Sequence, residues 1–356
     1  NEKAAMQVRE YLRNTRMLSL SMCEKYGMGV SKQSYPTSGR DAKWVEEVCI
    51  TFPWINTRQF TPTPSGSGSD SGLNEGDSLE QEQRYEIVRI KHRAMLTKGK
   101  QRMMPSGGQW GFFGWHLVNP SMPKTTTPDD SNDNSAKTNT GKGIVITEGE
   151  YDTIAVAEAI DHYCSNKSNT SNNSSKIQDL DLKSLPVVSL PNGCGSLPDD
   201  LLPRLESFTK IYLWLDFDSS GMAAATAFAK KLGIHRCFIV RPAKRQPDVK
   251  MIEETLRGLE LDIDIDILDS LDKFSTNFLK DANDYLRNGM ITHKGYVLGS
   301  NGHNSDNSDS VLGTNIKIYN EAVYSRNTSV MVDMLVNAES IRHEKILTFA
   351  DMKQEV

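Results

Sequence analysis

Carboxylates follow two short apolar segments of the sequence, and this pattern has the clearest chemical meaning. Residues 143–152 read GIVITEGEYD, and residues 211–221 read IYLWLDFDSSG. Each segment is apolar up to the point where Glu148, or the pair Asp216 and Asp218, begins. Continuous apolar runs of this length, bounded by glycine, are typical of strands buried on both faces. We therefore expect these three acids at the ends of two parallel strands.

The three acids together predict a divalent metal site. In an open parallel sheet, ligands bind beyond the carboxyl ends of the strands, and the sequence turns helical after each motif, at residues 153–160 and 223–232. Three carboxylates in one crevice repel one another unless a cation neutralises them. Oxygen ligands favour Mg²⁺ or Mn²⁺ over Zn²⁺, and Mg²⁺ held by carboxylates normally also binds substrate phosphates. The alternative is that the acids are ordinary loop residues or helix N-caps.

The elements around these motifs predict an α/β domain. Residues 187–190 and 236–240 are expected to add two further buried strands, and residues 198–205 are expected to start a helix. Alternating short strands and helices are typical of a parallel sheet flanked by helices. A glycine-rich turn, PNGCG at residues 191–195, could bring backbone N–H groups to a phosphate at the same sheet edge. Cys194 in this turn is not expected to act as a nucleophile, because no histidine can be placed beside it.

A smaller module is expected ahead of this sheet. Residues 4–20 have helical spacing, which favours a packing helix over one that contacts DNA. Residues 48–55 and 85–90 have the pattern of strands that pair as a hairpin with a long loop. A further helix is expected over residues 316–336. The predicted fold is α/β: a small basic α+β module, a parallel sheet flanked by helices, and a helical linker.

Residues 84–102 form a basic segment in a chain whose net charge is −5. Seven Lys or Arg residues stand there against one acid, and the aromatic segment QWGFFGWHL follows at residues 109–117. Basic residues next to aromatic ones are typical of a groove for nucleic acid or nucleotides. The alternative is a solvated lysine-rich strand followed by core aromatics. His92 and His116 could be ligands, although lone histidines are more often structural.

Composition bounds the class of protein. With 356 residues and 37% hydrophobic content, the chain is long enough for about two domains. An acidic balance argues against a general polyanion-binding surface but leaves a local basic patch open. Five scattered cysteines without a C-x-x-C pair predict neither a zinc site nor a disulfide framework within this chain. No apolar run of about 18 residues is present, so no membrane partner is expected.

Four tracts rich in Ser, Asn, Gly, Pro and acids interrupt the sequence, and we interpret them as surface insertions. They span residues 61–83, 120–142, 165–176 and 299–310. The acidic run LELDIDIDILDSLDKF at residues 259–274 is also interpreted as an insertion, and its aspartates are not expected to bind metal.

The motifs TEGEYD, DFDSSG and, at residues 280–284, KDAND resemble those of the TOPRIM domain of primases and topoisomerases. In detail, the sequence resembles the primase half of bacteriophage-type primase-helicases and their organellar relatives, the Twinkle group. This resemblance implies that Glu148, Asp216, Asp218 and Asp281 are the acidic metal set, with Mg²⁺ or Mn²⁺ as cofactor. Asp281 would otherwise be read as a helix N-cap.

The resemblance also implies an activity. It is that of a DNA primase, which makes short RNA primers on a single-stranded DNA template from NTPs. Glu148 would be a metal ligand or the general base for the attacking 3′-hydroxyl. The segments IKHR at residues 90–93 and FGWHL at residues 113–117 match the family's basic strand-turn-strand. They imply catalytic phosphate contacts from Lys91, Arg93 and Lys98. The wider set implied for nucleic-acid or nucleotide binding is Arg89, Lys91, Arg93, Lys98, Lys100 and Arg102.

The resemblance further divides the chain into residues 1–142, a basic primase module; residues 143–292, the TOPRIM domain; and residues 293–356, a linker towards a helicase domain. No G-x-x-x-x-G-K-[ST] motif is present, so the helicase partner is expected outside this sequence. The sequence is expected to be part of a longer protein located in an organelle, a mitochondrion or a plastid. No zinc ribbon can be formed here, which leaves template preference and stand-alone initiation open.

Two other functions remain open. One is a non-catalytic domain that binds single-stranded DNA and serves an attached replicative helicase. The other is a TOPRIM nuclease that uses the same metal site for hydrolysis. The four acids weigh against the first alternative, and the basic module and the KDAND motif weigh against the second.

Overall fold

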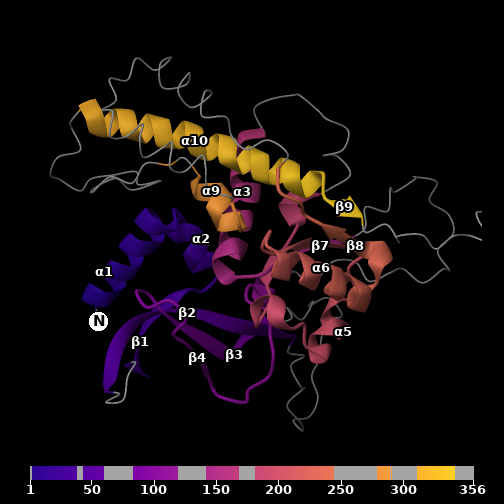
Figure 1. Cartoon of the computed structure of the whole chain (residues 1–356), viewed down its shortest axis with the longest axis horizontal. Coiled ribbons are helices and arrows are strands. Elements are labelled where there is room, and N and C mark those ends of the chain that lie inside the picture. The colour runs from indigo at the N-terminus through magenta and orange to yellow at the C-terminus, as the bar shows by residue number, and fades with distance from the viewer. Residues whose placement is uncertain are drawn as a thin grey trace, which may run out of the picture.

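The chain forms two β-sheets with helices around them in a computed structural model (Figure 1). The structure describes residues 2–37, 43–59, 83–118, 142–167, 181–243, 279–288, 290 and 311–340. A four-stranded sheet has the order β1-β2-β3-β4, and a five-stranded sheet has the order β6-β5-β7-β8-β9. The expected α/β class, with a small sheet ahead of a mainly parallel one, is therefore confirmed.

The small sheet is antiparallel throughout and contains the predicted hairpin. Its strands are β1 (Gly29–Pro36), β2 (Trp44–Gln59), β3 (Gln83–Ala94) and β4 (Gln101–Met104). Strands β2 and β3 pair with Phe52 opposite Lys91, and the register shifts at Trp54. Ile50, Phe52 and Trp54 alternate along β2 and are fully buried. One face of this sheet is therefore a core face, as period-two alternation requires.

The larger sheet is parallel except at one edge. Strand β5 (Gly143–Thr147) pairs with β6 (Val187–Ser189) on one side and β7 (Lys210–Trp214) on the other. Strand β8 (Cys237–Ile239) runs parallel to β7, and the two-residue β9 (Glu339–Ser340) closes the edge antiparallel to β8. Predicted strands at all four parallel positions are confirmed. Ile144, Val145 and Ile146 are fully buried, because β5 is covered on both faces.

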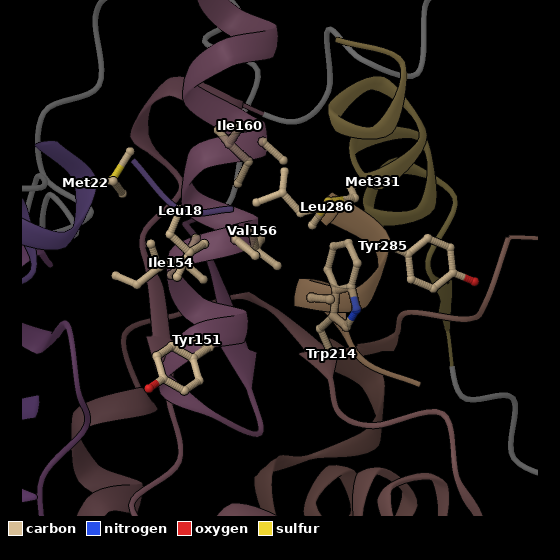
Figure 2. Close-up of a cluster of buried hydrophobic side chains, with 14 of the residues drawn as sticks. Leu18, Met22, Tyr151, Ile154, Val156, Ile160, Trp214, Tyr285, Leu286 and Met331 are labelled. Carbon is tan, nitrogen blue, oxygen red and sulfur yellow. The ribbon is translucent and has the colours of Figure 1, made fainter. Parts of the chain in front are cut away.

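Helices cover the two faces of this sheet with two separate hydrophobic clusters. On one face, α3 (Glu150–Lys167), α9 (Ala282–Arg287) and α10 (Val311–Val336) pack over Val145, Tyr212 and Trp214. Figure 2 shows this cluster, in which Leu286 and Met331 meet Val156 and Ile160 of α3. On the other face, α5 (Leu202–Leu205) and α6 (Ser219–Leu232) pack over the alternate residues of β5 and β7.

The N-terminal segment departs from the single helix predicted over residues 4–20. Helix α1 (Glu2–Glu10) continues into a π-helical stretch, Tyr11–Thr15, and then stops. Met17 adopts a positive φ of 54°, and Ser19 caps the new helix α2 (Leu20–Lys25) by accepting a hydrogen bond from the Met22 N–H. This break buries Leu18 completely. A continuous helix would not turn the chain at this point and would not bring Leu18 into the core. Core packing therefore overrides the helical spacing of the sequence.

The helix expected at residues 198–205 is a 3₁₀ turn, Asp199–Leu201, followed by the single turn of α5. Helix α10 confirms the helix expected over residues 316–336 and extends it at its N-terminus. In the part of the chain that the structure describes, no helix has the length and apolarity to cross a membrane.

Several predictions fall on residues outside the described ranges. These are the insertion tracts at residues 61–82, 120–141, 168–176 and 299–310 and the acidic run at residues 259–274. The domain boundaries stay predictions. Helix α10 lies across α3 and α9 in Figure 1, and its buried side chains belong to the same cluster as theirs.

Candidate active site

The predicted acids lie at one edge of the parallel sheet. Strands β5 and β7 are adjacent and in register, with Thr147 opposite Trp214, so the residues that follow them emerge together. The carboxylate of Glu148 accepts a hydrogen bond from the backbone N–H of Asp216, with a distance of 3.2 Å between Oε2 and N. The structure therefore brings Glu148 and Asp216 together, as the strand-end argument predicts.

Asp218 begins helix α6. Its Oδ1 accepts a hydrogen bond from the N–H of Gly221 at 2.9 Å, which is a helix N-cap. A Cβ atom at position 221 would collide with the backbone carbonyl of Asp216. The glycine in DFDSSG is therefore required because the first turn of α6 passes directly over Asp216.

One lysine joins the two aspartates. The ammonium of Lys280 lies 2.9 Å from Oδ2 of Asp216 and 2.9 Å from Oδ2 of Asp218. Its backbone is held as well, since its carbonyl oxygen accepts a 2.7 Å hydrogen bond from the N–H of Phe217. These contacts raise the pKa of Lys280, because hydrogen bonds to two carboxylates favour its charged form. A single positive charge thus neutralises a pair of acids.

The two aspartates are electrostatically different. Burial is the largest cause that raises the pKa of Asp216, to about 6; the hydrogen bond from Lys280 opposes this shift, and the charge of Glu148 adds to it. The pKa of Asp218 is lowered, first by the hydrogen bond from the Gly221 N–H and then by Lys280. The charged form of Asp216 is therefore disfavoured by its surroundings and gains from a nearby cation. The charged form of Asp218 is already stabilised by its hydrogen bonds.

Asp281 and Asp152 lie behind this edge, on α9 and α3. Asp281 caps α9 by accepting a hydrogen bond from the Asp284 N–H at 2.7 Å, and burial raises its pKa. Asp152 is buried and accepts a hydrogen bond from the Asn283 N–H at 3.1 Å. Burial and then the charge of Asp281 raise the pKa of Asp152 well above its usual value. Asp281 thus has a structural role, and its role as a metal ligand stays a prediction.

The residues fit a magnesium ion bound by two carboxylates rather than a complete protein cage. Among the described residues, no three His, Cys, Asp or Glu side chains are arranged as a ready ligand set. Asp216 and Asp218 do share one cation, the ammonium of Lys280. Mg²⁺ is usually held by one or two carboxylates together with water and substrate phosphates. The pair suits that mode, on the condition that the Lys280 side chain moves aside.

Two of the three predicted catalytic cations lie against the first turn of α3. Lys91 on β3 forms an ion pair with Glu150, with 2.7 Å between Nζ and Oε1; the exposed fractions of the two side chains are 11% and 1%. The guanidinium of Arg93 lies over the ring of Tyr151, 5.1 Å from its centroid. Glu150 and Tyr151 stand two and three positions after Glu148, so strand β3 brings positive charge to the start of the helix that follows Glu148.

The remaining basic residues occupy other parts of the small sheet. Arg89 is buried, donates a hydrogen bond from Nε to the Pro105 carbonyl at 2.9 Å, and stacks near Trp110. Lys100 forms an ion pair with Glu47 at 2.6 Å. Both are thus committed to contacts within the protein. Their roles in nucleic-acid binding, like those of the other predicted site residues, stay predictions.

Lys98 lies in the turn after β3, and Arg102 lies on β4. Lys98 is exposed in the turn between β3 and β4. The guanidinium of Arg102 lies between two aromatic rings, 5.7 Å from the centroid of Tyr35 and 6.0 Å from that of Trp44. Trp44 is 66% exposed, so this part of the sheet presents an aromatic ring and a cation to solvent.

His92 of the basic segment and His116 of the aromatic segment both have structural partners. Nδ1 of His92 lies 2.8 Å from the hydroxyl of Ser31, and Nε2 of His116 lies 3.1 Å from the carbonyl oxygen of Lys25. Burial lowers the pKa of each. These contacts match the structural interpretation of the two residues.

Arg16 was not predicted from the sequence as a residue near the site. Its guanidinium stacks on Tyr151 at 4.3 Å and donates to the side-chain oxygen of Asn283 at 3.4 Å, while the Asn283 amide donates to the Arg16 carbonyl at 2.9 Å. Arg16 therefore joins the N-terminal segment to α9 and α3. In the sequence it resembles its neighbours Arg9 and Arg13, so no signal distinguishes it. Lys280 was present in a recognised motif, but its position between two acids was not anticipated.

The protein also has a cavity of about 610 Å³ away from these acids. It lies between Tyr26, helix α3 at Ile160 and Cys164, and residues 182–187. None of the predicted catalytic, metal-binding or nucleic-acid-binding residues lines it. The chemistry that the residues support is at the open strand ends and not in this cavity.

Comparison with known proteins yields structural neighbours but no matching family model. One neighbour is the primase fragment of the bacteriophage T7 primase-helicase protein, with 19% identity and a TM-score of 0.36 over 69% of this chain and 71% of that one. A T7 complex of lagging-strand DNA polymerase with primase domains gives 20% identity and a TM-score of 0.35 over 69% and 87%. The Aquifex aeolicus primase is 11% identical, with a TM-score of 0.36 over 92% of this chain and 69% of that one.

Proposed function

We propose that this chain is a primase-type domain that synthesises short RNA primers on single-stranded DNA by metal-assisted nucleotidyl transfer. The observation that carries the proposal is the pair Asp216 and Asp218, which share one cation beside Glu148 at the carboxyl ends of two parallel strands. The sequence motifs that contain these acids support the choice of primase among the enzymes that use such a pair.

In this proposal, Asp216 and Asp218 hold Mg²⁺ or Mn²⁺ against the triphosphate of the incoming nucleotide. When bound, the metal would neutralise charge on the α-phosphoryl group that is transferred to the 3′-hydroxyl and on the pyrophosphate that leaves. Glu148, whose Oε2 accepts a 3.2 Å hydrogen bond from the Asp216 N–H, would act as general base for the 3′-hydroxyl or as a further ligand. Asp281 fixes the start of α9 and thereby the position of Lys280 next to it.

Positive charge on the opposite wall would orient the substrate phosphates. Arg93 and Arg16 stack on the same Tyr151 ring, next to Glu150, and Lys98 is exposed in the turn between β3 and β4. Lys91 would have to exchange its partner Glu150 for a phosphate. Guanidinium groups suit phosphate because their donors form a planar fork.

The test is primer synthesis on single-stranded DNA with labelled NTPs and Mg²⁺ or Mn²⁺. We expect short RNA products from the wild type and at least about a 100-fold loss for Asp216→Asn, because metal stabilisation is worth several kcal/mol. Asp199→Asn is a matched control, since Asp199 is an exposed aspartate on the same domain. Absence of product from the wild type, or equal product from Asp216→Asn, would refute the proposal.

A second candidate is a non-catalytic domain that binds single-stranded DNA for an attached helicase. The observation in its favour is that Lys280 and Lys91 are each already paired with carboxylates. It would be supported if the same assay gave no product while DNA binding was tight, salt-sensitive and unchanged by Asp216→Asn. A Twinkle-like relationship and an organellar location stay predictions from the sequence.

A further inference from the structure

Lys280 occupies the position between two carboxylates that a bound cation would need. Its ammonium is 2.9 Å from one oxygen of Asp216 and 2.9 Å from one oxygen of Asp218. A divalent ion bound to the same two oxygens would therefore lie within a few ångströms of the ammonium. Two positive charges at that separation repel each other, so the two cations cannot share the pair at low cost.

The side chain of Lys280 is free to leave, although its backbone is not. The side chain is 49% exposed, while the backbone carbonyl and N–H are fixed by Phe217 and by the carboxylate of Asp284. A flexible four-carbon stem can thus move the ammonium into solvent without moving α9. The exposed fraction of Asp216 is 16% and that of Asp218 is 40%, so ions from solution can reach the pair.

We propose that Lys280 is an internal counter-ion of the acidic pair, which it neutralises until a divalent metal displaces it. The inference rests on the proposed function, because the metal is the one assigned to that site. It predicts that metal affinity is set by competition with this lysine. Removal of the ammonium should therefore tighten metal binding, which is the opposite of what loss of a supporting residue would do.

The experiment is a titration of the whole chain with Mn²⁺, with free Mn²⁺ followed by electron paramagnetic resonance. Lys280→Met is expected to bind Mn²⁺ roughly 3- to 30-fold more tightly than the wild type, since two partly exposed ion pairs no longer compete. Lys280→Arg keeps the charge and should stay within about twofold of the wild type. Unchanged or weaker binding by Lys280→Met would overturn the proposal.

Lys32→Met is the matched control. Lys32 forms an ion pair with Glu46 at the same 2.9 Å, and its side chain is 46% exposed, but it lies on the small sheet. It should leave Mn²⁺ affinity unchanged. A gain in affinity equal to that of Lys280→Met would show a general charge effect and would also overturn the proposal.

Thermal unfolding gives a second readout that does not depend on activity. Without metal, Lys280→Met should melt below the wild type, because Asp216 and Asp218 then repel each other. Mn²⁺ should raise its melting temperature more than it raises that of the wild type, by linkage. If Lys280→Met does not fold, Lys280→Gln is used in both measurements, with the same expected and overturning results.

The outcomes separate this inference from the proposed function. Primer synthesis together with unchanged Mn²⁺ affinity in Lys280→Met would leave the function standing and overturn the competition. Tighter Mn²⁺ binding by Lys280→Met, together with no primer synthesis by the wild type, would support the competition and refute the proposed function. No Mn²⁺ binding by any variant would overturn the inference, since there would be no metal for Lys280 to oppose.

Discussion

Replacement of Lys91 by methionine should destabilise the protein strongly. Lys91 is the partner of Glu150, whose side chain is 1% exposed, and the two charged atoms are 2.7 Å apart. Removal of one member of a buried ion pair costs about 3–5 kcal/mol, because the other charge is left without a partner. Since Lys91 itself retains 11% exposure, some water can reach the site, and we expect the lower end, about 3 kcal/mol.

The measurement is urea unfolding of Lys91→Met, monitored by tryptophan fluorescence. The double variant Lys91→Met/Glu150→Gln should recover at least half of the loss, because no unpaired charge remains. Lys98→Met is the control, since Lys98 is exposed, and its free energy of unfolding should stay within about 0.5 kcal/mol of the wild type. If Lys91→Met lost less than about 1 kcal/mol, the ion pair would not be a structural feature of the core.

Three further predictions concern the supports of the site. Gly221→Ala should cost at least about 3 kcal/mol and disturb Asp216, because the new Cβ collides with its carbonyl; Gly195→Ala, with open space around it, should cost little in the same urea unfolding assay. Burial raises the pKa of Glu158 in the folded protein to about 7, so the free energy of unfolding falls as pH rises towards 7, because the unfolded chain has then lost the proton that the buried side chain keeps. Relative to Glu158→Gln, the wild type should lose about 2–3 kcal/mol of this free energy between pH 5 and pH 8. Asn283→Ala should cost about 1–3 kcal/mol in urea unfolding because it removes buried hydrogen bonds to the N-terminal segment. Equal costs at positions 221 and 195, a pH-independent difference at position 158, or an unchanged stability at position 283 would each contradict the reasoning.

The positions of the acids could be predicted because the signals are local. An apolar run such as residues 144–147 identifies a strand buried on both faces. Parallel strands present their carboxyl ends at one edge of the sheet, so acids that follow two such strands are expected to lie together. Glu148 and Asp216 are consequently hydrogen-bonded to each other, as expected of neighbours at that edge. The pairing of β2 and β3 could also be predicted, since each strand has a strand-like residue pattern in the sequence.

The contacts of the site could not be predicted because they are non-local. Nothing in the pattern around Lys280 reports that its ammonium reaches residues some sixty positions earlier in the chain. The break before α2 is set by the burial of Leu18 and not by propensity. Strand β9 has two residues and no apolar pattern, and only its pairing with β8 identifies it. Lys91 was predicted as a phosphate contact from the family resemblance, whereas its partner in the structure, Glu150, depends on how β3 packs on α3.

The most direct test of the site is a crystal grown with Mn²⁺ and a non-hydrolysable nucleoside triphosphate, with diffraction recorded at the manganese edge. We expect an anomalous peak about 2.0–2.3 Å from carboxylate oxygens of both Asp216 and Asp218, with nucleotide phosphate on the same ion and the Lys280 ammonium displaced. A structure with the nucleotide bound, no manganese at this pair and Lys280 still between the two aspartates would contradict it.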